Sequence, residues 1–283
     1  MARPNHRGQG AHKKELIALM RETARRHHLY RVFADFCEMS ALAISNSVDR
    51  SQFAAREERY LQIVKGYEPA EVEKFPRMLA ILVDWLQCGL ADCLGELFMS
   101  LELGDHWKGQ FFTPYSVASV MASICLTDVK ETVQREGFVS ICEPACGAGG
   151  MLIACAEAAL EQGVNYQTAM HVTAIDIDAT SVHMAYVQLS LLNVPAIVIH
   201  GNALSLEQRA HWVTPAHVLG GWDFKLRRRA AGDCEDEARL HVAPMSTRNT
   251  PEIGERASLE SLSTEEVRST IVASRLDQLD LFG

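Results

Sequence analysis

A glycine-rich turn at residues 142–150, CEPACGAGG, limits the folds open to this chain more than any other segment. An apolar segment typical of a β-strand precedes it at 138–142, and a segment with helical spacing follows at 151–162. Glycine tolerates backbone conformations that other residues avoid, and it lets a ligand come close to the backbone. A strand, a glycine turn and a helix in this order predict a nucleoside-binding α/β fold, although the turn alone does not identify the ligand.

The pattern from residue 113 onward predicts strands that alternate with helices, which is typical of a parallel sheet. Thr113 and Pro114 predict a helix start, with Thr113 as the N-cap, leading into a helix at 116–125. Two further helices are expected at 151–162 and 180–192, and strands at 138–142, 171–175, 196–200 and, as a short fourth strand, 217–219. With only three or four strands, the fold class expected is α/β, a truncated Rossmann-like fold.

A helical region precedes the sheet. Apolar residues recur three and four apart from residue 12 to residue 103, and Pro76 is expected to open a long segment that Gly89 and Gly95 can interrupt. After residue 230 the chain is polar and acidic, so much of it is expected to be disordered. The predicted domains are an N-terminal helical domain with a basic arm, an α/β domain and an acidic tail, at 1–103, 104–229 and 230–283.

Composition excludes several classes of protein. No apolar run approaches the roughly 20 residues of a membrane span, and the N-terminus lacks a signal sequence, so we expect a cytoplasmic protein with no membrane partner. The eight cysteines show no CxxC spacing, which predicts buried free thiols. His200, His211 and His217 are close in sequence but lack metal-ligand spacing, so we expect no metal.

Basic residues are concentrated in two places, although the net charge is −9. Lys and Arg dominate residues 1–28, and a second group, KLRRR, lies at 225–229. Either group could neutralise DNA phosphates. Both are equally compatible with a solvated arm and a solvated loop.

Polar side chains follow the second and third predicted strands. Asp176 follows the second strand, where a carboxylate can bind the hydroxyls of a ribose in sites for nucleotides and for S-adenosylmethionine (SAM) alike. Asn202 follows the third strand, where an amide can contact the edge of an adenine.

Several motifs occur together in an order that resembles the N6-adenine DNA methylase family, especially the modification subunits of type I restriction systems. They are GQFFTP at 109–114, EPACGAG at 143–149, Asp176, and Gly201 with Asn202, and the resemblance extends over about 92–204. It implies that SAM is the cofactor, that Asp176 holds its ribose and that Asn202, where many relatives carry Asp, contacts its adenine. The residues implied around its methionine part are Phe111, Thr113, Pro114, Glu143, Ala145, Gly147 and Gly149.

One motif of that family is missing. The family presents Asn or Asp, then Pro-Pro and an aromatic residue, to hold the target adenine, and this sequence contains no such tetrapeptide. Thr214 to His217 is a degenerate candidate, with Trp212 or Trp222 as the stacking ring. The alternatives are an ordinary Thr-Pro turn and packing tryptophans. His217 and Trp212 are therefore weak catalytic candidates, and the catalytic residues stay unknown.

The C-terminus resembles the short peptide with which bacterial proteins bind the sliding clamp. The residues concerned are Gln278, Leu279, Asp280, Leu281 and Phe282. Such a peptide places apolar side chains in a pocket of the partner, whereas the same residues could also form a last turn that packs on the chain's own core.

Two functions follow from these motifs. The first is a SAM-binding DNA adenine-N6 methyltransferase whose activity is weak or depends on a partner, for example a specificity subunit or a second copy of the chain. The second is a noncatalytic SAM- or DNA-associated interaction module of a mobile element, which the C-terminal peptide could tether to the sliding clamp. The missing motif favours the second, and the order of the remaining motifs favours the first.

Overall fold

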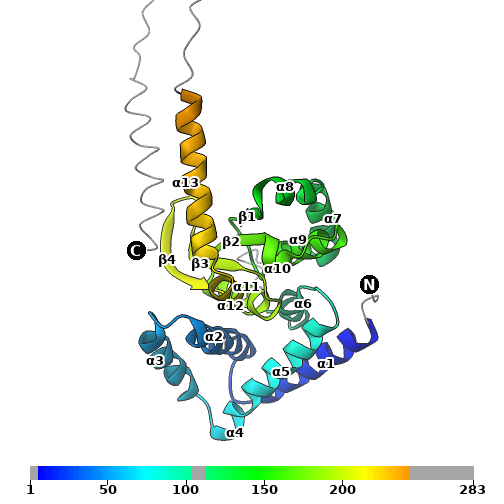
Figure 1. Ribbon diagram of the computed structural model, residues 1–283. Helices are drawn as coiled ribbons and strands as arrows, with labels where there is room; N and C mark the ends of the chain where they lie inside the picture. Colours follow the sequence, from blue (N-terminus) through cyan, green and yellow to red (C-terminus); the bar gives the residue numbers. More distant parts are fainter. Residues whose placement is uncertain (1–5, 104–111, 242–283) are drawn as a thin grey trace, which may run out of the picture. The chain divides into compact units, whose positions relative to one another are not determined.

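A computed structural model describes residues 6–103 and 112–241, with side chains from residue 9 to residue 231 (Figure 1). The part before residue 234 forms one compact unit. The expected α/β class is confirmed, because a four-stranded sheet is combined with helices, several of which come before it in the chain. The domain boundaries at residues 103 and 229 stay a prediction.

Within the described residues, six helices lie in the part of the chain before residue 103. They are α1 (His6–Thr23), α2 (Leu29–Val48), α3 (Phe53–Val64), α4 (Pro69–Val72), α5 (Lys74–Gln87) and α6 (Cys93–Ser100). Their core is apolar and contains Phe33, Met78 and Trp85, each at most 1% exposed. The long segment expected after Pro76 is two helices, because Gly89 takes a φ of 145° and ends the first one, whereas Gly95 lies within α6.

The sheet has the order β1-β2-β3-β4, with β1 (Val139–Glu143), β2 (Met170–Asp176), β3 (Ala196–Asn202) and β4 (Glu207–Val213). The first three strands are parallel, as expected, and β4 runs antiparallel to β3. Helices α9 (Gly150–Glu161) and α11 (Ala179–Leu191) connect the parallel strands, and the short α10 (Tyr166–Ala169) precedes β2. The carboxyl ends of β1 and β2 therefore meet at one edge of the sheet.

The two faces of the sheet are covered unequally. Val172, Ala174 and Val198 share one face and are 0% exposed, and α11 packs on the strands that carry them. On the opposite face His171 lies under Trp222, with ring centroids 5.3 Å apart. Farther along that face, the side chain of Cys142 on β1 is exposed. Parallel sheets are normally covered on both faces, so the uncovered part of this one is unusual.

Several local predictions were wrong. Residues 217–219 are helical and belong to α12 (Pro215–Leu219), which begins at Thr214 because the Thr214 hydroxyl accepts a hydrogen bond from the His217 amide. The true fourth strand, β4, was missed because most of its residues are polar and exposed. The N-cap of α7 (Tyr115–Cys125) is Pro114, not Thr113, and α8 (Val129–Glu136) was also missed.

The last helix, α13 (Trp222–His241), begins in the compact unit and extends beyond residue 230, where disorder was expected. Arg229 on this helix donates a hydrogen bond to the carbonyl of Phe138 and pairs with Glu136. The sliding-clamp-like segment, 278–282, lies outside the described residues. None of the described helices combines the length and the apolar composition that a membrane span requires.

Candidate functional site

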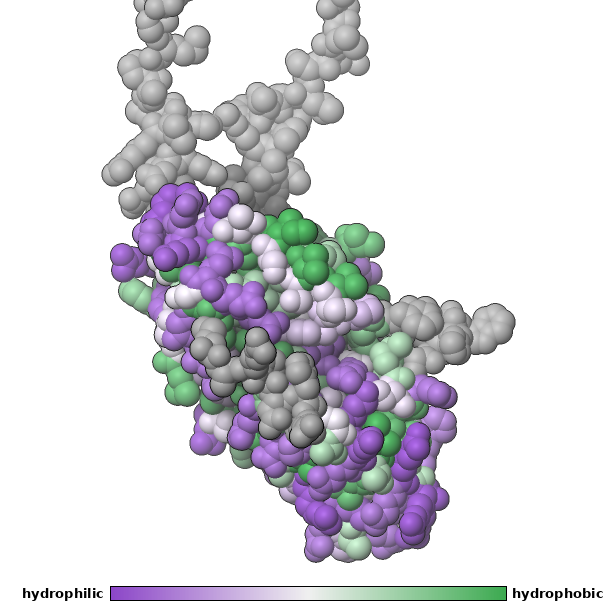
Figure 2. Space-filling model, turned by 90° about the vertical axis from the view of Figure 1, so that its right-hand side faces the viewer, coloured by the Kyte–Doolittle hydropathy of each residue, from purple (hydrophilic) through white to green (hydrophobic). Residues whose placement is uncertain are grey.

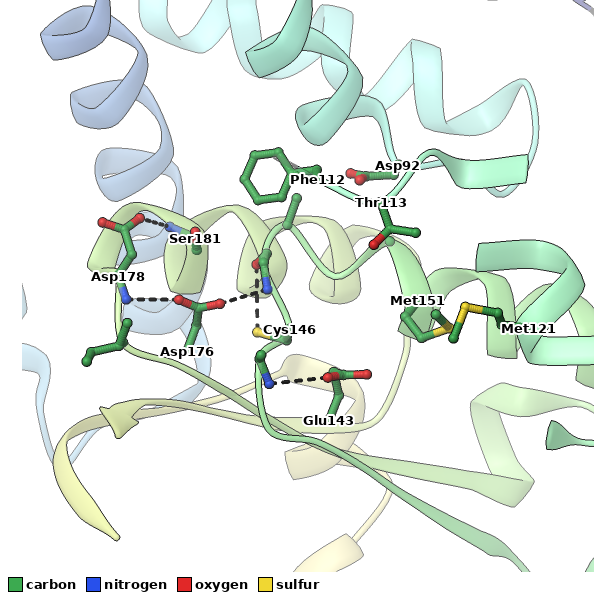
Figure 3. Close-up of a pocket in the computed structure, with 15 residues that line it drawn as sticks. Asp92, Phe112, Thr113, Met121, Glu143, Cys146, Met151, Asp176, Asp178 and Ser181 are labelled. Atoms are coloured by element: carbon green, nitrogen blue, oxygen red, sulfur yellow. Dashed lines mark hydrogen bonds between the residues drawn. The ribbon is translucent and has the colours of Figure 1, made fainter. Parts of the chain in front are cut away.

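A cavity of about 690 Å³ opens at the carboxyl ends of β1 and β2 (Figure 3). The glycine turn forms its floor, and residues from the start of α11, from α7 and from the segment before α7 contribute to its walls. Its described lining residues are Asp92, Phe112, Thr113, Met121, Glu143, Ala145, Cys146, Gly147, Ala148, Gly150, Met151, Asp176, Ile177, Asp178 and Ser181. A volume of this size is typical of small-molecule sites.

The turn requires glycine at two positions. Gly147 has a φ of 52° and Gly149 a φ of 90°, values that side chains with a Cβ rarely adopt. Phe112 lies against Gly147 so closely that a Cβ there would come within 2.9 Å of its ring. Gly149 faces Ala185 on α11, where a Cβ would lie 3.4 Å from the backbone. The two glycines thus let the turn pack between an aromatic ring and a helix.

Asp176 organises the cavity end next to β2. Its Oδ2 accepts a hydrogen bond of 2.8 Å from the Gly147 amide, and its Oδ1 accepts one of 2.9 Å from the Asp178 amide. Asp178 in turn caps α11 by accepting a bond of 2.8 Å from the Ser181 amide. Because a carboxylate oxygen can accept more than one hydrogen bond, Asp176 can also accept from a ligand. The Gly147 amide, by contrast, already donates its hydrogen bond to Asp176.

Asp92 enters the cavity from the start of α6 and is 7% exposed. Its Oδ1 accepts hydrogen bonds of 2.8 Å from the Gly95 amide and from Nε2 of Gln188. Gln188 also donates to the Ala148 carbonyl and accepts from the Leu94 amide, so it joins α6, α11 and the glycine turn. A Cβ at residue 150 would lie 2.8 Å from Asp92 Oδ2, so this carboxylate is close to the N-terminus of α9.

All charged side chains in the described lining of the cavity are acidic. Four carboxylates line it, those of Asp92, Glu143, Asp176 and Asp178, and its described lining includes no Lys, Arg or His. Burial raises the pKa of Asp92, because a charge loses its hydration there. A cationic or hydroxyl-rich ligand suits this site, and a polyphosphate does not.

Cys146 also lines the cavity but is 6% exposed. Burial, followed by the nearby charges of Asp176 and Glu143, raises the pKa of its thiol. A thiol that stays protonated is a poor nucleophile, so these contacts favour a packing role for Cys146. The expectation of buried thiols does not hold everywhere, because Cys125 and Cys142 are free and exposed.

The predicted cofactor-binding residues are distributed unevenly. Thr113, Glu143, Ala145, Gly147 and Asp176 line the cavity, whereas Pro114, Gly149 and Asn202 do not belong to its described lining. Pro114 caps α7 with its carbonyl, and Gly149 supports the turn. The remaining predicted contact, Phe111, lies outside the described residues.

Asn202 uses its side-chain oxygen locally. It accepts hydrogen bonds from the Leu204 amide at 2.9 Å and from the Ser205 amide at 3.3 Å. The amide oxygen therefore stabilises the turn between β3 and β4. Its role as an adenine contact stays a prediction.

The two catalytic candidates lie in the interior. His217 is 1% exposed, and its Nε2 lies 2.9 Å from Asp223 and its Nδ1 2.9 Å from His171. Trp212 is 6% exposed, and the guanidinium of Arg56 lies 4.2 Å from the centroid of its ring. Neither residue is part of the described cavity lining. These contacts favour packing roles, and they give a catalytic role no support.

Sequence reasoning missed two acidic residues of the cavity. Asp92 belongs to the segment DCLGE at the start of the region of resemblance, 92–204, and none of the motifs that carry the resemblance connects it with the cofactor. Asp178 shows the signature of an N-cap, two residues after Asp176. The position of Asp178 at a helix start was therefore readable, whereas the position of Asp92 depends on the contact of α6 with α9 and α11.

The arrangement of the sheet, the glycine turn and Asp176 defines a class of protein. A parallel sheet with a glycine turn after its first strand and an acid after its second is typical of nucleoside-binding α/β proteins. Residues 100–247, more than half of the 283, match the family model for the N-6 DNA methylases. The chain belongs to the N-6 DNA methylase family, whose methyl donor is SAM.

The solved structures that are similar to this chain include the following three. A protein assigned to the class I SAM-dependent methyltransferases of Listeria monocytogenes is 18% identical, with a TM-score of 0.38, over 69% of this chain and 54% of that one. The type I restriction-modification methyltransferase subunit of Streptococcus thermophilus is 18% identical, with a TM-score of 0.29, over 46% of this chain and 28% of that one. The DrdV–DNA complex is 15% identical, with a TM-score of 0.34, over 80% of this chain and 28% of that one.

This chain therefore spans about half the length of the first of these structures and about a quarter of the other two. A comparison with curated protein sequences gives no significant match.

Proposed function

We propose that the protein binds SAM in the cavity beside β1 and β2 and serves in adenine-N6 methylation of DNA, with methyl transfer dependent on a partner polypeptide. The observation that carries the proposal is the set of four carboxylates around a cavity whose described lining has no basic side chain. SAM has a positive sulfonium and a positive ammonium group against a single carboxylate, so its net charge is positive and an acidic cavity is complementary to it.

The charge also separates SAM from the dinucleotides that use a similar glycine turn. A dinucleotide site places a pyrophosphate at the N-terminus of the helix after the turn. Here the carboxylate of Asp92 lies close to that N-terminus, and the Gly147 amide donates to Asp176. A phosphate would meet a negative charge there and would find one backbone donor fewer.

Particular residues fit particular parts of SAM. Asp176 and Asp178 carry acceptors at the β2 end of the cavity and would hold the ribose hydroxyls. Thr113 and Glu143 would surround the methionine part, and Met121 and Met151 supply apolar surface beside it (Figure 3). Bound SAM supplies an electrophilic methyl group.

The groups that would hold the target adenine are not evident in this site. Methylation at N6 needs an acceptor for the amine hydrogens and a ring that stacks on the extruded base. The described lining offers Phe112 as an aromatic ring, but this ring packs edge to face on Phe98, with centroids 5.1 Å apart. We infer that a partner supplies the Asn- or Asp-Pro-Pro-aromatic segment.

The side of the sheet next to β1 supports this inference. Among the described strands β1 has a neighbour on one side only. Helix α7 exposes an apolar stripe, which consists of Val117, Val120, Met121 and Ile124 at 46% to 70% exposure. Figure 2 faces this side and shows hydrophobic side chains grouped in its upper part. Met121 belongs to both the stripe and the cavity, so a partner that adds a strand beside β1 would reach the site.

Binding of SAM is tested by calorimetry with the wild type and Asp176→Ala. We expect the wild type to bind SAM and the variant to bind at least tenfold more weakly, because it loses a ribose acceptor and the support of Gly147. Glu207→Gln is the matched control, since Glu207 is an exposed carboxylate that pairs with Arg209. NAD bound more tightly than SAM would contradict the proposal.

Methyl transfer is tested with labelled SAM and DNA. We expect no label on adenine with the chain alone, and transfer when a polypeptide that carries the missing motif is coexpressed and copurifies. Ile124→Asp should abolish this transfer but leave SAM binding unchanged. Transfer by the chain alone would refute the dependence on a partner. SAM binding with no transfer under any of these conditions would support the alternative, a noncatalytic module.

A further inference from the structure

We propose that Asp92 is the anionic partner of the α-ammonium group of the bound cofactor. This inference rests on the proposed SAM site and assigns to it a residue that the family motifs around the glycine turn do not include. It starts from the position of Asp92, which lines the cavity at the end away from Asp178 (Figure 3).

The side chain of Asp92 is buried and turned toward the cavity. It is 7% exposed and lies beside Phe112 and Thr113 in the close-up (Figure 3). Its Oδ1 accepts from the Gly95 amide and from Gln188. Within the described part of the chain, no hydrogen bond ends at Oδ2 and no Lys, Arg or His pairs with this carboxylate.

A buried carboxylate without a cation is costly, because neutral donors replace only part of its lost hydration. The neighbouring acid, Glu96, is of the same sign, and its own cation is Lys13 at 2.7 Å. The N-terminus of α9 offsets part of the cost. A ligand that brings an ammonium group into the cavity would supply the missing charge.

The cavity has room for this division of roles. Asp176 and Asp178 stand at its β2 end, where they suit hydroxyl groups, and Asp92 stands near Thr113 at the other. Glu143 lies on the floor, where its Oε1 accepts from the Ala145 amide at 3.2 Å. An adenosine whose ribose reaches Asp176 would therefore extend its amino-acid end toward Asp92.

The inference predicts an effect that depends on the ligand. Two ligands are compared: S-adenosylhomocysteine, which has the amino-acid group, and 5′-methylthioadenosine, which lacks it. Asp92→Asn should weaken binding of S-adenosylhomocysteine at least tenfold and change binding of 5′-methylthioadenosine less than twofold. Loss of one charge-assisted hydrogen bond accounts for about tenfold or more.

The control is Glu96→Gln, which removes a negative charge from the same helix outside the cavity. It should change neither affinity by more than twofold. Asp92→Ser serves as a second variant, because Ser caps helices well and can keep the bond to the Gly95 amide. We expect it to show the same ligand dependence as Asp92→Asn.

Equal losses for the two ligands in both variants would overturn the inference, because they would assign Asp92 a structural role only. Unchanged affinity for S-adenosylhomocysteine would also overturn it. If the wild type bound neither ligand, the proposed SAM site itself would fail. If the wild type bound both ligands and the variants did not discriminate between them, only the role of Asp92 would fail.

Discussion

The two flanks of the sheet differ in how they are closed. On the β4 flank, Arg56 from α3 stacks on Trp212, donates to the His211 carbonyl at 2.8 Å and pairs with Asp49 at 2.8 Å. On the β1 flank, the buried residues of α7 are the small Ala118 and Ala122, and α7 exposes the apolar side chains of Val117, Val120, Met121 and Ile124. The N-terminal helices thus cover the β4 side of the sheet, whereas the β1 side, next to the cavity, keeps apolar side chains exposed.

The largest expected effect is on the closed flank. Trp212→Ala removes a buried ring that contacts Arg56, His183 and Tyr186, so it should destabilise the fold by about 3–5 kcal/mol. Chemical denaturation monitored by circular dichroism measures this change. A loss below about 1 kcal/mol would show that the β4 flank is not a tight interface, and the contrast between the flanks would disappear.

The second effect concerns the contact between the cavity and the helices. Gly150→Ala would place a Cβ 2.8 Å from Asp92 Oδ2, so we expect a loss of about 1–3 kcal/mol together with weaker SAM binding. Gly10→Ala is the control, because a Cβ at Gly10 in α1 meets nothing within 4 Å and should stabilise the helix by about 1 kcal/mol. Equal behaviour of the two variants would argue against a close approach of Asp92 to α9.

A third prediction concerns the pH dependence of stability and His171, on the face of the sheet that Trp222 covers. Burial, followed by the neighbouring His217, lowers the pKa of His171 to about 3. An unfolded histidine has a pKa of about 6.5, so above that pH the neutral side chain of His171 makes its full contribution to the free energy of unfolding. This contribution is lost as pH falls toward 3, because the unfolded chain binds the proton more readily.

Between pH 6.5 and 5, the free energy of unfolding should therefore fall with a slope that steepens toward about 1.4 kcal/mol per pH unit for this group. His171→Gln should flatten the slope, and the exposed His211→Gln should not. An unchanged slope in His171→Gln would mean that water reaches the face under Trp222.

The smallest effect on stability is expected on the open flank. Ile124→Ser exchanges a side chain that is 70% exposed, so the free energy of unfolding should change by less than about 0.5 kcal/mol. A loss above about 2 kcal/mol in thermal or chemical denaturation would show that Ile124 is buried in the folded chain in solution. The stripe on α7 would then belong to the core, and the flanks would not differ.

Local sequence patterns were enough to predict the glycine turn, the acid after the second strand and the order in which they occur. The glycine turn and the acid after the second strand depend on local rules of backbone conformation and strand ends, so Gly147 and Asp176 were predicted, and both line the cavity. The family followed from the same motifs. Their use in binding SAM stays a proposal.

Which distant residues line that site, and which are buried away from it, depends on how the helices and strands pack. Asp92 enters the cavity because α6 packs on α9 and α11 through Gln188, a contact over 96 residues that no local pattern encodes. Trp212 and His217 are buried for the same kind of reason: Arg56 covers the one, and His171 and Asp223 satisfy the other. Local spacing fixes elements and turns, whereas burial depends on which surfaces meet.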